Sequence, residues 1–228
     1  MPESNVLTWD DLGNKRFETG TDKGVLYPYE NGKPGTGVAW SGLTGVDESP
    51  EGAEANAFYA DNMKFLVIRS AEDYKGTIKA YMYPPEWEAC DGSAAPDGTV
   101  GLTVGQQTRK TFGFAFRTKV GNDVDYDDFA YKIHLVYGAT AAPSERSYET
   151  VNDSPNPTEL SWDFETIPVS VAGFKPFAHM EIDTSKLKTE SEKACLKKLE
   201  DILYGNSTAK ARLPLPDEII KIMTPEAA

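Results

Sequence analysis

Two strand-like segments joined by an acidic turn constrain the fold of this chain more than any other feature. Apolar side chains occupy every second position in both segments: Phe112, Phe114 and Phe116 in the first, and Tyr131, Ile133, Leu135 and Tyr137 in the second. A period of two indicates β-strands. Residues 121–128 between them are rich in Gly, Asn and Asp, which tolerate turn dihedrals. The sequence therefore predicts a long antiparallel hairpin over residues 109–138 with a buried aromatic face.

Further strand patterns and one helical pattern occur along the rest of the chain. Thr189 and Glu192 fit the S/T-x-x-E capping box, and the apolar residues that follow lie on one helical face until Gly205, a typical residue after a helix end. The sequence Pro84-Pro85-Glu86-Trp87 begins a segment that fits one helical turn. We predict about eight or nine strands, including segments at residues 24–27, 37–46, 63–69, 78–82, 100–104, 160–164 and 177–182.

Length and composition favour a single domain spanning residues 1–228. A chain with 39% hydrophobic residues can bury one sizeable core. The net charge of −13 argues against a surface that binds nucleic acid or anionic membranes, although it does not exclude a passage that nucleic acid slides through. The start has no signal-peptide pattern, and no run approaches the roughly 18 apolar residues of a membrane span. We expect synthesis in the cytoplasm, no membrane contact, and reduced thiols at Cys90 and Cys195.

Three segments lack a regular pattern. They are an N-terminal arm over about residues 1–14, a long loop over about residues 47–62, and a C-terminal tail over about residues 206–228. The loop is acidic and is long for a connection inside a compact domain, which is typical of functional or mobile loops. We interpret it as an arm that reaches a partner, with a plain mobile loop as the alternative. The tail is apolar enough to pack on the body or on a neighbour.

No residue set predicts catalysis, a cofactor or a metal site. His134 and His179 each lie in a strand alternation beside apolar neighbours, which favours a structural or surface role, and two histidines cannot form a three-histidine zinc site. The acidic run at residues 123–128 lacks the Gly and the bidentate Glu of an EF-hand loop. The sequence therefore predicts a protein that is not an enzyme.

Acidic charge is concentrated in three windows. Neither Lys nor Arg occurs in residues 34–63, 80–108 and 147–174, whereas acidic residues recur in all three. Two interpretations remain open at this point. The windows are ordinary solubilising surface, or they line an acidic cavity that several copies form together.

Five segments of the chain resemble a known family. They begin with GVLYPYENGKPGTGVAWSGLTGVDESPEGAEANAFYADNMK at Gly24 and include SAEDYKGTIKAYMYPPEWEACDG, VGQQTRKTFGFAFRT, YKIHLVYGATAAPSERSY and LYGNSTAKARLPLPDEIIKIM. Together they resemble the major tail tube protein of long-tailed, non-contractile (siphovirus-type) bacteriophages, of the kind common in Firmicutes phages and prophages. The similarity runs in the same order through nearly the whole chain.

The resemblance implies a fold and an assembly. The fold would be mainly β, an antiparallel β-sandwich or partial barrel with one flanking α-helix at about residues 190–204. Subunits of this family form hexameric rings that stack into the phage tail tube, a virion structure assembled in the bacterial host cytoplasm. DNA passes through the lumen without specific binding, and the tape-measure protein and the tail-tip and terminator proteins are the other partners. The resemblance does not identify the lumen-facing residues.

Under this interpretation the irregular segments contact neighbouring subunits. The candidate contact residues are Trp9, Asp47, Glu48, Glu51, Glu54, Phe58 and Tyr59. The face of the long hairpin opposite the three phenylalanines, which carries Thr111, Gly113, Ala115 and Arg117, is either a wall of the lumen or part of an outer sheet or subunit seam.

The alternative function is a monomeric β-sandwich module that binds carbohydrate or protein. In that case Trp40, Tyr81 and Trp87 would form an exposed aromatic platform.

Overall fold

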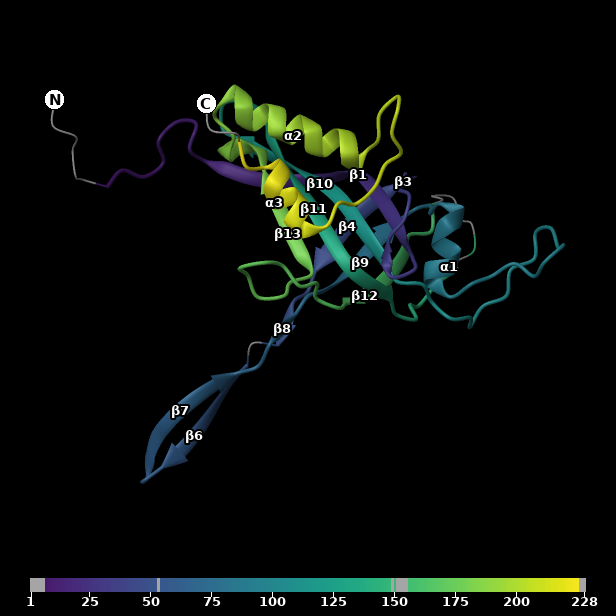
Figure 1. Cartoon of the computed structure of the whole chain (residues 1–228), viewed down its shortest axis with the longest axis horizontal. Helices are drawn as coiled ribbons and strands as arrows, with labels where there is room; N and C mark the ends of the chain where they lie inside the picture. The colour runs from purple at the N-terminus through teal and green to yellow at the C-terminus, as the bar shows by residue number, and fades with distance from the viewer. Residues whose placement is uncertain (1–6, 53, 149, 151–155, 226–228) are drawn as a thin grey trace.

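The computed structural model, which describes residues 7–52, 54–148, 150 and 156–225, is mainly β, as predicted. Its body is one antiparallel sheet in the order β2-β1-β10-β11-β12-β9-β4, with β13 paired to β11 and β3 paired to β1 (Figure 1). The strands of this sheet are β1 (Arg16–Glu30), β2 (Lys33–Pro34), β3 (Val38–Trp40), β4 (Leu43–Glu48), β9 (Lys75–Ala80), β10 (Phe112–Asn122), β11 (Tyr126–Ala141), β12 (Leu160–Thr166) and β13 (His179–Asp183).

The predicted long hairpin is confirmed and forms the centre of the sheet. Strands β10 and β11 pair antiparallel, with Ala115 opposite Leu135, and β1 pairs with the other edge of β10. The connecting turn is held by the Asn122 side chain, whose Oδ1 accepts hydrogen bonds from the backbone N–H groups of Val124 and Asp125 at 2.9 and 2.5 Å. Asn122 therefore closes the turn by side chain to backbone bonding.

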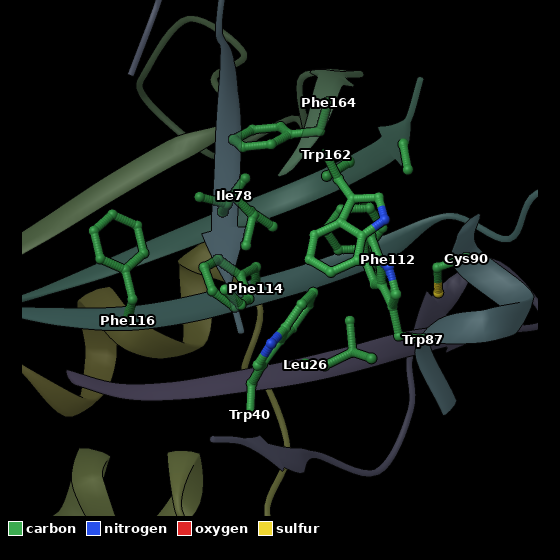
Figure 2. Close-up of a cluster of buried hydrophobic side chains, with 14 residues drawn as sticks. Leu26, Trp40, Ile78, Trp87, Cys90, Phe112, Phe114, Phe116, Trp162 and Phe164 are labelled. Carbon is green, nitrogen blue, oxygen red and sulfur yellow. The ribbon is translucent and has the colours of Figure 1, made fainter. Parts of the chain in front are cut away.

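The concave side of the curled sheet encloses an aromatic core (Figure 2). The three phenylalanines of β10 are buried there, as predicted. Their neighbours include Trp40 and Trp87, whose ring centroids lie 4.7 Å apart, and Trp162, which packs edge-on against both. Tilted and edge-on contacts are the favoured geometries of aromatic pairs. The sheet curls around these rings without closing into a barrel, since β4 ends the hydrogen-bonded order.

The short helical turn predicted after Pro84 is also present. It comprises a 3₁₀ turn (η1, Pro85–Trp87) and α1 (Glu88–Asp91). This turn inserts Trp87 and Cys90 into the aromatic core, where both are fully buried. Its role is therefore to close one end of that core.

The convex side of the sheet is covered by helices and forms a second core. Helix α2 (Glu190–Leu203) begins with the predicted capping box at Thr189 and Glu192, and Leu199 and Leu203 on its inner face are fully buried. The 3₁₀ turn η2 (Thr184–Lys186) leads into it. The sequence therefore predicted both the flanking helix and its start correctly, and Gly205 with φ of 77° follows its end.

The hypothesis that the second face of β10 lines a lumen is wrong. Ala115 is fully buried among helix residues, and a Cβ at Gly113 would lie 2.4 Å from Leu213 Cδ2. Arg117 instead forms two 2.6 Å hydrogen bonds to the Asp22 carboxylate on β1. The face has small residues because helices and the C-terminal segment pack closely on it, not because cargo passes over it.

The C-terminal segment packs on the body of its own chain. Helix α3 (Pro216–Ile222) buries Ile219 in the second core, and Leu213 lies beside it. Tyr137 donates a 3.0 Å hydrogen bond to the Pro214 carbonyl, which fixes the segment to β11. Of the two alternatives for the tail, packing on the body therefore holds for these residues.

The strand predicted at residues 100–104 is absent. Within this segment Val104 forms only an isolated β-bridge, with Ala94, and Val100 is 99% exposed. Glycines at 98 and 101 adopt positive φ, which interrupts an extended strand. The apolar alternation therefore does not correspond to a buried face.

Truncating the aromatic core should destabilise the protein strongly. Phe114→Ala removes a fully buried ring that packs on Trp40 and Phe116, and we expect the free energy of unfolding to fall by about 3–5 kcal/mol. Urea unfolding followed by tryptophan fluorescence measures this change. Tyr81→Ala, at a side chain that is 52% exposed, is the control and should cost less than about 1 kcal/mol. Equal losses for the two variants would contradict the assignment of the core.

Candidate assembly surface

A two-stranded hairpin projects far from the body of the molecule (Figure 1). It consists of β6 (Ala55–Ala60) and β7 (Met63–Arg69), and its base is formed by β5 (Glu51–Gly52) paired with β8 (Glu72–Asp73). We call residues 49–74 the projecting arm. The expectation of a loop over residues 47–62 is therefore wrong: β4 continues to Glu48, and residues 55–60 form a strand.

The projecting arm exposes a concentration of apolar side chains. All described residues of β6 and β7 are exposed, including large aromatic side chains: Phe65 is 71% exposed and Tyr59 is 72% exposed. An isolated two-stranded hairpin is only marginally stable in water, and contiguous exposed apolar surface marks interaction sites. The large apolar residues of the hairpin are Phe58, Tyr59, Met63, Phe65, Leu66, Val67 and Ile68.

Both faces of the hairpin are exposed to solvent, and the outer edge of each strand has no paired neighbour within the described residues. Phe58 lies opposite Leu66 on one face, and Ala57 lies opposite Val67 on the other. Strands β6 and β7 pair with each other and form a separate two-stranded sheet, so the outer edge of each is unpaired within the described chain. Both apolar packing and strand addition are therefore available to a partner.

Two of the predicted contact residues belong to the body instead of the arm. Asp47 and Glu48 end β4, where they pair with Thr77 and Gly76 of β9. Asp47 also forms a 2.7 Å salt bridge with Lys79. The Asp47 side chain therefore helps to fix the edge strand β4 to its neighbour β9.

The other predicted contact residues lie on exposed segments. Glu51 sits at the base of the arm and forms a 3.1 Å salt bridge with Lys75, and the Glu54 carbonyl accepts a 3.2 Å hydrogen bond from Ser70 N–H. Phe58 and Tyr59 lie on β6, and Trp9, which is 76% exposed, lies on the N-terminal segment. The structure thus unites Phe58 and Tyr59 with the apolar residues of β7, which sequence reasoning had assigned to an ordinary strand.

The structure brings the two histidines together with Glu48. His134 on β11 and His179 on β13 have Nδ1 and Nε2 3.3 Å apart, and Glu48 Oε1 lies 3.5 Å from each of these nitrogens. His134 is buried, and the side chain of Glu48 is partly exposed. The sequence predicted no metal site here, because the two histidines were considered without a carboxylate from β4. We refer to these three residues as the Glu–His–His cluster.

Both cysteines are free and buried, in different cores. Burial raises the pKa of the Cys90 thiol to about 12, so this side chain is a protonated thiol at neutral pH. Its environment favours a packing role.

Comparison with known proteins leaves the family open. No protein-family model matches the chain, and a search of the curated proteins gives no match either. Within the described residues, the helices are all too short or too polar to cross a membrane.

The body should fold without the hairpin. Ser70 and Glu54 already join the strands by a backbone hydrogen bond, so an Asn-Gly turn can replace residues 55–69. We expect the free energy of unfolding to change by less than about 1 kcal/mol, because no residue of this segment belongs to either core. Thermal unfolding followed by circular dichroism checks this. Loss of cooperative unfolding would show that the hairpin supports the body.

Proposed function

We propose that this chain is a structural subunit that polymerises into a phage-type tail tube, as hexameric rings stacked on one another. The resemblance of the sequence to major tail tube proteins motivates the proposal, and the mainly β fold with a flanking helix is compatible with it. Its location would be the virion, after assembly in the bacterial host cytoplasm. Its partners would be further copies of itself, with the tape-measure, tail-tip and terminator proteins.

The projecting arm is the observation that carries this proposal. The body encloses two cores, and no residue of β6 or β7 belongs to either of them. Folding of the single chain therefore does not explain why the arm exposes so many apolar side chains. A neighbouring subunit that covers β6 and β7 would remove this surface from water at about 25 cal/mol per Å². If the hairpin packs on a different surface of its neighbour, the contact joins unlike surfaces, and contacts of that kind generate rings and stacked polymers.

Further exposed segments fit the same assembly. The N-terminal segment carries Leu7, Trp9 and Leu12, all exposed. The segment that follows α1 extends from the opposite side of the body (Figure 1). Permanent interfaces of a polymer bury on the order of 2,000 Å² or more, which requires several such segments.

The acidic charge gives the proposed tube a way to conduct DNA. A basic lumen would bind the DNA backbone through release of its counterions, whereas an acidic or neutral wall leaves DNA mobile. The net charge of −13 is compatible with such a wall. Because salt screens charges over about 8 Å at physiological ionic strength, the effect would be to prevent adhesion and not to drive transport.

The alternative function, a binding module, depended on an exposed aromatic platform of three residues, and two of these residues are buried. Trp40 and Trp87 lie in the aromatic core, 3% and 0% exposed, and only Tyr81 of the three proposed platform residues is exposed. No other observation favours that function, and we do not propose it.

Electron microscopy and sedimentation velocity of the purified protein test the proposal. With increasing concentration the protein should form six-fold rings or tubes. The variant Phe58→Ser with Leu66→Ser removes one cross-strand apolar pair from the arm. We expect this variant to need at least about tenfold higher concentration to assemble, because each such side chain contributes about 1.5–3 kcal/mol when buried.

A matched variant separates loss of apolar surface from any change at these positions. Phe58→Leu with Leu66→Ile keeps the arm apolar and should assemble like the natural protein. A strictly monomeric natural protein at all concentrations would contradict the proposed polymer. Normal assembly of the serine variant would contradict the role of the arm.

A further inference from the structure

The Glu–His–His cluster has the donor geometry of a metal site. Its three donor atoms form a triangle with edges of 3.3, 3.5 and 3.5 Å. Around an ion bound tetrahedrally at about 2.0–2.1 Å, two ligand atoms lie about 3.3–3.4 Å apart. The triangle therefore matches one face of such a tetrahedron.

The 3.5 Å distances are less well explained by hydrogen bonding alone. Good N–H···O hydrogen bonds have donor to acceptor distances of about 2.7–3.2 Å. Glu48 Oε1 is 3.5 Å from the ring nitrogens of both His134 and His179. A shared cation would satisfy all three donor atoms at once.

The surroundings hold the two imidazole rings in place. His134 lies parallel to Phe116, with ring centroids 4.5 Å apart, and His179 lies parallel to Tyr74 at 4.7 Å. Thr118 Oγ1 is 3.0 Å from Nε2 of His134. If Nε2–H donates to this hydroxyl, the Nδ1 lone pair faces the cluster, which is the usual outer-shell arrangement of a metal-binding histidine.

The chemical types of the three ligands also suit a cation. The Tyr74 hydroxyl is buried near the Glu48 carboxylate. One carboxylate and two imidazole nitrogens form a ligand set that suits Zn²⁺.

We infer that Glu48, His134 and His179 form a binding site for one Zn²⁺ ion per chain, with the fourth coordination position left for water. The site lies at the base of the projecting arm, because Glu48 is the last residue of β4 before the arm begins. Strand β4 hydrogen-bonds to β9, whereas the histidines lie on β11 and β13. A bound ion therefore links the base of the arm to strands that it does not otherwise pair with.

Isothermal titration of the full chain with ZnCl₂ tests this site. We expect one ion per chain and a rise in the thermal unfolding midpoint, since the ion binds the folded state. Mg²⁺, which prefers oxygen ligands in octahedral geometry, should not bind. The four-coordinate complex formed with Co²⁺ should give visible absorption. Failure of Zn²⁺ to bind would overturn the inference and leave the three residues as a hydrogen-bonded cluster.

Two substitutions locate the ion. Glu48→Gln and His179→Gln should each weaken Zn²⁺ binding at least about tenfold, since each removes a ligand. Glu51→Gln, at a carboxylate that pairs with Lys75 outside the cluster, should bind like the natural protein. Equal Zn²⁺ affinity in all three variants would overturn the site.

Hydrogen exchange gives a readout that does not depend on substitution. Adding Zn²⁺ should slow exchange at the end of β4 and along β13, where the ligands lie. Slowed exchange confined to other segments would place the ion elsewhere and overturn the inference. The test uses dilute monomer, so its result is independent of whether the protein forms tubes.

Discussion

The packing of both faces of β10 and β11 is the constraint on which the rest of the structure depends. Phe114 and Phe116 point into the aromatic core, and Ala115 between them points toward helix α2. The same alternation in β11 places Val136 on one side and Leu135 on the other. Because one pair of strands forms a wall of both cores, the remaining strands and helices have fixed positions around it.

This arrangement explains why the projecting arm is free to act on another molecule. The body satisfies its two cores with its own residues, including the C-terminal Leu213 and Ile219. The arm adds exposed apolar surface at no evident benefit to the single chain, which is the pattern of a subunit that completes its burial by assembly. The Glu–His–His cluster at the base of the arm would then stiffen the junction between body and arm without contributing to the contact itself.

The sequence predicted the elements whose patterns reflect burial on one face or a local backbone signal. Phe112 to Phe116 alternate because every second side chain enters the aromatic core, and Thr189 and Glu192 mark a helix start through hydrogen bonds within four residues. Strand β6 was missed because both of its faces are bare, so Ala57 and Phe58 show no alternation of apolar and polar residues. The helical cover over Ala115 was missed because small residues suit both close packing and an open wall.

The Glu–His–His cluster could not be predicted from spacing. Its residues lie on three separate strands, and they meet because β11 pairs with β13 while β4 curls toward them. The proposed contact role of Phe58 and Tyr59 follows from the sequence, because two adjacent aromatics within an acidic segment need a surface to pack on. That they share one hairpin with Phe65 and Ile68 could not be predicted, because it depends on the pairing of β6 with β7.

A cryo-electron microscopy reconstruction of the assembled protein, at a resolution that traces side chains, tests the central claim most directly. We predict a polymer in which β6 and β7 lie on a neighbouring subunit, with Phe58 and Leu66 buried in that contact. A polymer in which the hairpin stays in solvent would contradict it.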